Sequence, residues 1–239
     1  MYINALNMKN KINLTAVALL ICFSSCVKDI GVQVQSVIKT PDFNGILQDA
    51  ALDIVLSQGP GFSVEYEGSD IVLGDLEFVV GHGKLIITQH GHYAYSGKSR
   101  IYITAPDLTC IESTSSGDIY SHNRFYFKGR ADLKLSSSGD LDLNLDAFDL
   151  NTSIRGSGTL RLEGNADFHS IEHEGFGPLY AYPLFTNQTR ITSSSSGNSE
   201  IQVRNTLIAR LRGSGNITFI GSPFVDYIVT GFGKLIDGN

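Results

Sequence analysis

The fold of this chain is decided by the stretch 156–165, which reads GSGTLRLEGN. The stretch opens on a glycine-centred turn and continues into alternating apolar and polar residues. Related phrases recur between residues 115 and 233, and the steps between their third positions are 22, 19, 19, 20, 18 and 18 residues. Self-similarity at such a period is the signature of a stacked repeat. The seven copies are Ser115–Gly117, Ser137–Gly139, Gly156–Gly158, Gly175–Gly177, Ser195–Gly197, Gly213–Gly215 and Gly231–Gly233.

The residues around each glycine turn alternate in polarity. Apolar side chains stand two and four places after the turn, as at Leu160 and Leu162, and mostly polar ones stand between them. A period of two with one apolar face predicts a half-buried strand. Each repeat is therefore expected to be a strand, a glycine turn, a strand and a second corner such as Glu163–Asn165. Glycine at the turn indicates either a positive φ or a close approach of neighbouring backbones.

Strands joined in this way predict an all-β fold, a right-handed parallel β-helix or solenoid with coils of 18–22 residues. Equivalent strands of successive coils would lie ~4.8 Å apart. We expect the solenoid over residues 43–239. Strand-like runs also occur at 52–56, 62–66, 84–88 and 100–104. The segment that starts at Gly81–Gly83 echoes the one that starts at Gly231–Gly233, so we interpret it as an eighth repeat followed by a protruding loop at 89–99.

Residues 1–25 have the pattern of a lipoprotein signal peptide. Lys9 and Lys11 form a basic head, an apolar run covers residues 14–23, and small residues precede Cys26. The pattern predicts lipid attachment at Cys26, a tether over residues 26–42 and a place in the outer membrane, facing the cell surface or the periplasm. An ordinary secretory signal is the alternative, and both Met1 and Met8 fit as the start.

Charge and cysteine content narrow the function classes. The formal net charge is −6, and the isoelectric point near 5.4 argues against nucleic acid as a partner. Cys22 leaves with the leader and Cys26 takes the lipid, so Cys110 has no partner and no internal disulfide is expected.

No catalytic, metal or cofactor site is expected from the residues. His90-Gly91-His92 is the best metal-like arrangement, but no acid or cysteine in that loop completes it. His169 and His173 lie in the same repeat; His173 falls in the inward register, between Glu172 and Glu174, and is expected to be a hydrogen-bonded core histidine, with a catalytic role as the alternative. Charged residues one coil apart predict cross-coil ion pairs, Asp142 with Arg161 and Arg155 with Glu174. A polysaccharide-acting enzyme on a β-helix is the alternative. Such an enzyme would need several acids gathered on one face, whereas residues at equivalent places in successive repeats here are a mixture of acidic, basic and aromatic types.

Outward aromatic side chains give a candidate binding surface for a glycan or an envelope protein. Tyr180 and Tyr182 lie on one strand and Tyr120 shares the column of Tyr180, while aromatic rings are enriched at interaction surfaces. The alternative is that these rings pack over adjacent coils. The candidate residues are Tyr120, Phe176, Tyr180, Tyr182, Tyr93, Tyr95 and Phe232.

The last coil raises the question of self-association. An uncovered coil exposes unpaired backbone groups, which invite pairing with another chain. Because Asn239 stands only six residues after Gly233, we expect no C-terminal capping helix and predict a homo-oligomer formed through the C-terminal coil.

Two segments and the chain of turns also carry a family resemblance. The segments 52–59 (LDIVLSQG) and 101–108 (IYITAPDL), with the glycine turns, resemble the family called putative auto-transporter adhesin, head GIN domain, common among Bacteroidetes lipoproteins. The resemblance covers residues 43–237, and Phe176 and Phe232 replace the usual turn serine. It implies a β-helical fold at the cell envelope and an adhesin-like role, with no defined binding residues to carry over. A structural partner of an envelope signalling system is a further alternative.

Overall fold

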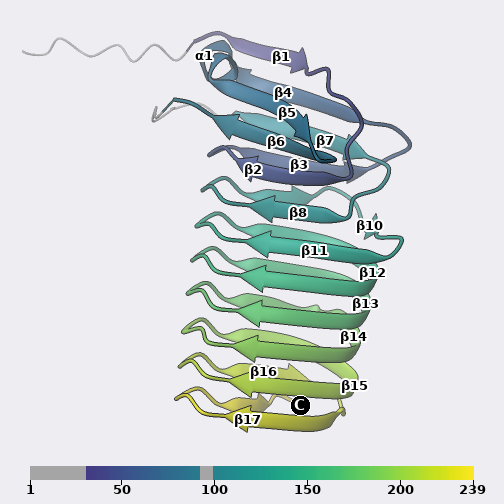
Figure 1. Ribbon diagram of the computed structural model, residues 1–239, viewed down its shortest axis with the longest axis vertical. Helices are drawn as coiled ribbons and strands as arrows, with labels where there is room; N and C mark the ends of the chain where they lie inside the picture. Colours follow the sequence, from purple (N-terminus) through teal and green to yellow (C-terminus); the bar gives the residue numbers. More distant parts are fainter. Residues whose placement is uncertain (1–30, 92–98) are drawn as a thin grey trace, which may run out of the picture.

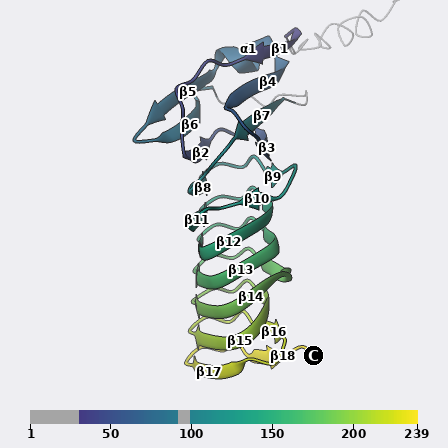
Figure 2. The same ribbon diagram turned by 90° about the vertical axis from the view of Figure 1, so that its right-hand side faces the viewer.

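A computed structural model describes residues 31–91 and 99–239, and it has the predicted all-β solenoid architecture. The strands stack as successive rungs along the long axis, and a broader assembly of strands closes one end (Figures 1 and 2). From β8 onward, every pairing between described strands is parallel. The right-handed winding stays a prediction.

The central rungs are made by four long strands that run through the second corner without a break. We expected two strands separated by a corner, but each of these is one bent strand. Gly164 shows why, because its φ of +118° bends β13 while Glu163 and Asn165 on either side of the bend stay in the ladder with β12. The four strands are β12 (Leu141–Ile154), β13 (Leu160–His173), β14 (Leu179–Ser193) and β15 (Ser199–Leu211).

Shorter strands complete the stack on either side. Those before a glycine turn pair with one another, as do those after it, so each rung contributes to both faces. They are β8 (Cys110–Ser113), β9 (Ile119–Ser121), β10 (Phe125–Tyr126), β11 (Arg130–Leu135), β16 (Ile217–Ile220), β17 (Phe224–Val229) and β18 (Leu235–Asp237).

The core is a set of apolar columns inside the coil. Leu141 pairs with Leu160, and Leu160 with Leu179, and all three side chains are at most 1% exposed. The period-two expectation for the inward face is therefore confirmed. Burial of such columns from rung to rung is the main stabilising contribution in a solenoid, where each coil contacts only its neighbours.

The glycine turns need close backbone approach. At Gly158 an added Cβ would lie against the carbonyl oxygen of Gly139 in the preceding rung, and the φ of Gly158 is not positive. Glycine is therefore required at this turn by the close approach of neighbouring backbones and not by a positive φ.

The N-terminal part caps the parallel stack with antiparallel strands. β4 pairs antiparallel with β1 and β7, and β5 pairs antiparallel with β6. β6 and β7 belong to the parallel ladder through β2 and β3. The cap and first rungs are β1 (Gln33–Val37), β2 (Gly45–Asp49), β3 (Asp53–Gln58), β4 (Ser63–Ser69), α1 (Asp70–Gly74), β5 (Leu76–Gly81), β6 (Lys84–Gln89) and β7 (Arg100–Ala105).

Two expectations for this part are corrected. Gly81–Gly83 is not an eighth repeat, because Gly81 pairs with Lys84 across a hairpin whose two turn residues, His82 and Gly83, have φ of 51° and 77°. Such a primed turn reverses the chain instead of passing it to the next rung. Residues 33–37, expected within the tether, form strand β1.

The four strand-like runs are confirmed as β3, β4, β6 and β7. The short helix α1 was not expected; its N-cap is Ser69, whose Oγ accepts a hydrogen bond from the backbone N–H of Ile71 (3.3 Å). No described helix has the length and apolar character needed to cross a membrane. The leader, Cys26 and most of the predicted loop, residues 92–98, lie outside the described residues.

Candidate functional site

The second corner of the solenoid carries a groove that runs along the stack, with a volume of about 820 Å³. We call it the corner groove. Its first wall is one outward column, in which Tyr126 pairs with Asp146, Asp146 with Asn165, Asn165 with Phe185 and Phe185 with Gln202. At ~4.8 Å per rung, the two aromatic residues of this column stand about 14 Å apart.

The floor of the groove lies below its walls because the floor residues are small. Ala147 pairs with Ala166, Ala166 with Thr186, and Thr186 with Val203. Thr186 turns its hydroxyl inward, donating to the carbonyl oxygen of Gln202 (2.7 Å), and so leaves the hollow open.

The second wall comes from the residues that follow the floor positions. They occupy the bend itself, where the period of two slips so that Asp167 and Phe168 both face outward. The second wall consists of Phe148, Asp167, Asn187 and Arg204.

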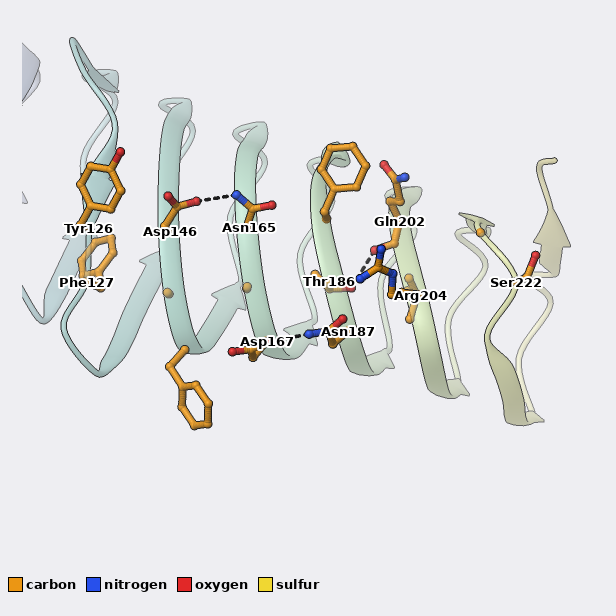
Figure 3. Close-up of a pocket in the computed structure, with 16 residues that line it drawn as sticks. Tyr126, Phe127, Asp146, Asn165, Asp167, Thr186, Asn187, Gln202, Arg204 and Ser222 are labelled. Carbon is orange, nitrogen blue, oxygen red and sulfur yellow. Dashed lines mark hydrogen bonds between the residues drawn. The ribbon is translucent and has the colours of Figure 1, made fainter.

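Hydrogen bonds between rungs fix the polar side chains of both walls (Figure 3). Asn165 donates through Nδ2 to Asp146 Oδ1 (2.8 Å), and Asn187 donates through Nδ2 to Asp167 Oδ1 (2.5 Å). Each bond uses one carboxylate oxygen and one amide N–H. The second carboxylate oxygen of Asp167 and the amide oxygens of both pairs stay available as acceptors, so the walls can receive hydroxyl donors.

The charges in the groove are unevenly placed. Asp146 is held by Arg124, whose Nη1 lies 3.5 Å from Asp146 Oδ2. Arg204 is exposed, and it takes part in none of the ion pairs found among the described residues. The groove therefore presents carboxylates over the earlier rungs and a guanidinium over β15.

Aromatic rings border the groove on both sides. Tyr126, Phe148 and Phe185 are each 58–59% exposed. Phe148 meets Phe168 edge to face, with ring centroids 5.4 Å apart, which holds its ring in position. Exposed rings that flank a row of acceptors provide stacking faces and hydrogen bonds together, as sites for sugars require.

The predicted tyrosine surface lies elsewhere, on the strands that follow the glycine turns. Tyr120 and Tyr180 do share a column, but Asp142 and Arg161 separate them. Arginines approach both rings: Arg100 lies 5.8 Å from the ring centroid of Tyr120 and Arg161 lies 5.9 Å from that of Tyr180.

The other members of that surface are scattered. Tyr182 is half-buried, and burial raises the pKa of its hydroxyl. Phe176 and Phe232 are 75% and 94% exposed at glycine turns, but the serine turns at Ser196 and Ser214 lie between them. Tyr93 and Tyr95 are outside the described residues. None of the five described members lines the corner groove, and their binding role stays a prediction.

The histidines behave as core or surface groups. His173 is buried and contacts Ser199 Oγ (2.9 Å) and the Gly177 carbonyl (2.8 Å), so the expectation of a hydrogen-bonded core residue is confirmed. His169 is buried against Thr152 Oγ1 (2.9 Å), and burial lowers its pKa to about 3. His90 pairs with Glu77 at 2.9 Å. Residues 31–91 and 99–239 hold no group of three or more His, Cys, Asp or Glu side chains arranged for a metal, while His92 is outside them.

The cross-coil ion pairs are confirmed in one case and shifted in the other. Arg155 Nε lies 3.0 Å from Glu174 Oε2. Arg161 does pair in register with Asp142, but its Nη1 contacts Asp140 Oδ2 at 2.9 Å, at the adjoining turn.

Sequence reasoning missed the corner groove because it treated the second corner as a connection. A signal was present. Ala147 and Ala166 are small residues at matching places, each flanked by an acid or amide, and the inward–outward alternation slips just after them. The depth of the groove could not be read from that pattern, because it depends on how far the long strands bend.

Comparisons with known proteins agree with this architecture. A family model described as putative auto-transporter adhesin, head GIN domain, matches residues 42–223. The chain belongs to this family. The head GIN domain assignment indicates a cell-surface or envelope protein and favours a non-enzymatic role.

Two solved structures show the same fold as this head GIN domain. A putative adhesin from Bacteroides fragilis is 22% identical, with a TM-score of 0.80 over 85% of this chain and 96% of that one. A putative adhesin from Parabacteroides distasonis is 21% identical, with a TM-score of 0.70 over 86% and 96%. No curated protein matches the chain.

Proposed function

We propose that this protein is a lipid-anchored envelope adhesin that holds a linear glycan in the corner groove. One observation carries the proposal: exposed rings at Tyr126 and Phe185 lie in one column on either side of Asp146 and Asn165. The column follows the axis of the rod, so a linear polymer laid along it would meet a ring, two hydrogen-bonding side chains and a second ring in turn.

The size and rigidity of the groove support the same ligand class. About 820 Å³ falls within the range of small-ligand sites, ~300–1,000 Å³. Its walls stand on paired strands, and the amide–carboxylate bonds hold the polar groups before a ligand arrives. Less conformational entropy is then lost on binding.

The anchor rests on the sequence alone. An apolar run that ends in small residues before Cys26 supports lipidation there, and several acyl chains would hold the protein firmly at a membrane. The solenoid would then extend from the outer membrane either into the periplasm or to the outside of the cell.

Binding to a glycan array tests the groove. We expect binding of the full chain to a set of linear glycans, lost on Phe185→Ala and reduced about five- to thirtyfold on Asn165→Ala, since a stacking contact or a hydrogen bond contributes ~1–2 kcal/mol. Tyr180→Ala and Phe176→Ala are matched controls, because both are exposed aromatic residues outside the groove. If only these two changes abolished binding, the tyrosine surface would be the site and the groove proposal would fail.

The enzymatic alternative is tested on the same ligands. We expect no new reducing ends after prolonged incubation with any oligosaccharide that binds. Release that disappears in Asp146→Asn or Asp167→Asn would instead show that the groove is catalytic.

The anchor is tested separately. Cys26→Ser should move the protein from the membrane fraction to the soluble fraction and abolish incorporation of labelled fatty acid, with glycan binding unchanged. Unchanged fractionation would contradict the anchor and leave the groove untouched. Protease treatment of intact cells would then report which side of the membrane the solenoid faces.

A further inference from the structure

The two ends of the stack differ in how they are finished. At the N-terminal end, β4 and β5 lie antiparallel on the first parallel rung, formed by β6 and β7. At the other end, β17 pairs only with β15, and β18 only with β16. Within the described residues, nothing covers the outer edges of β17 and β18. Free strand edges of this kind readily add another strand.

The open end also exposes apolar side chains. One rung earlier, the inward residues Leu207, Ala209 and Leu211 are at most 1% exposed. Their partners in β17 are Val225, Tyr227 and Val229, and of these Tyr227 is 57% and Val229 is 39% exposed. The apolar columns of the core thus end at a surface from which water is not excluded.

The backbone of β17 offers hydrogen bonds on that side. Thr230 donates its N–H to the carbonyl of Leu211 (2.8 Å), toward β15. Because successive residues of a strand direct their backbone groups to opposite sides, Val225, Tyr227 and Val229 direct theirs to the open edge. A partner must supply both strand backbone and apolar side chains.

A second copy of this chain meets both requirements. Its own first parallel rung is already paired with β4 and β5, so the parallel ladder cannot simply continue from one copy to the next head to tail. It can present the same open end, and two identical edges related by a two-fold axis pair antiparallel. We propose that the protein forms a tail-to-tail dimer in which β17 of one copy pairs antiparallel with β17 of the other, with Tyr227 on the two-fold axis.

The position of the axis follows from the side chains. Continuity of the core requires inward residues to face inward residues, so the axis must pass through a residue and not between two. An axis at Asp226 would set two carboxylates opposite one another, which is unfavourable. An axis at Tyr227 pairs Val225 with Val229 of the second copy and keeps the aspartates apart. Each Asp226 then remains with Arg210 of its own chain, 2.9 Å away.

Introduced cysteines test both the dimer and its register. In the full chain with Cys22, Cys26 and Cys110 changed to serine, we expect light scattering to give twice the monomer mass. Mild oxidation should link Tyr227→Cys into a covalent dimer, because residues opposite one another at a hydrogen-bonded antiparallel position lie within disulfide range, ~5.5 Å between Cα atoms. Asp226→Cys should link on the order of tenfold less, since its mate lies two positions away.

A charge at the same position gives a second measurement. Tyr227→Lys should be monomeric, whereas Phe232→Lys, in the same coil but 94% exposed at the turn, should stay dimeric. Circular dichroism checks that both variants are folded. If Tyr227→Lys does not fold, the cysteine cross-linking experiment still tests the dimer. A monomer at all concentrations, or preferential linkage through Asp226→Cys, would overturn the proposal.

Discussion

At the scale of single residues, the glycine turns are governed by distance between backbones. Because glycine has no Cβ, the backbone of one turn can lie directly against the carbonyl of the turn before it. This contact explains why glycine recurs at the third position. Gly158→Ala is therefore expected to lower the free energy of unfolding by about 3 kcal/mol, the upper part of the range for overpacking. Denaturant unfolding measures it. Gly129→Ala is the control, because nothing lies within 4 Å of its added Cβ, and an equal loss there would contradict the explanation.

A second residue-scale prediction concerns acid stability. His169 is buried and its pKa is lowered to about 3 by burial, whereas in the unfolded chain it titrates near its ordinary value of 6.5. Between these pH values the unfolded state binds one more proton. The contribution of His169 to stability is therefore fully present above about pH 6.5 and falls by ~1.4 kcal/mol per pH unit between pH 6.5 and about 3.

His169→Leu should make this pH dependence shallower by the same ~1.4 kcal/mol per unit between pH 4 and 6. Leucine suits the column, since Leu150 is the neighbour in the rung before. Unfolding curves at several pH values measure the slope. An unaltered slope in His169→Leu would show that this histidine is not responsible.

At the scale of elements, the rungs are also joined beside the turns by an acid–amide ladder. Asp118 Oδ1 accepts from the backbone N–H of Asp140 (2.8 Å), and Asp140 Oδ1 accepts from that of Thr159 (2.7 Å). Asn198 and Asn216 repeat the arrangement later in the stack. Each of these side chains thus bonds the backbone of the next rung.

Asp140 offers a test of this ladder. Burial opposes its ionisation, but the bonds from Thr159 and Arg161 outweigh burial and hold the pKa of the carboxyl below its usual value. Its contribution is thus present at neutral pH and is lost as the pH falls through that lowered pKa. Asp140→Ala should lower the free energy of unfolding by about 1 kcal/mol, and Asp140→Asn should restore most of it. Equal losses in both variants would show that the acceptor oxygen is not what matters.

At the scale of the whole molecule, the stack should be most stable in its centre. β12 to β15 have partners on both sides, while β17 and β18 have one each. Since solenoid stability is built from neighbour contacts, hydrogen exchange should be slowest in the central strands. The amides of Val225, Tyr227 and Val229 should exchange rapidly in Tyr227→Lys and slowly in the dimeric protein. Uniform exchange along the rod would contradict this account.

The amino-acid sequence determined the repeat, its period, the inward columns and the parallel ladder, because each of these depends on contacts between equivalent residues about twenty positions apart. The alternation of Leu160, Arg161 and Leu162 is enough to assign an inward and an outward face. The tertiary structure alone decided that Gly81–Gly83 reverses the chain, since the residues that follow it match a true repeat. It also decided that the second corner is a bend with a groove. The shape of this groove depends on the angle between the two halves of one strand. Packing against the rungs on either side fixes that angle, so no local sequence pattern predicts it.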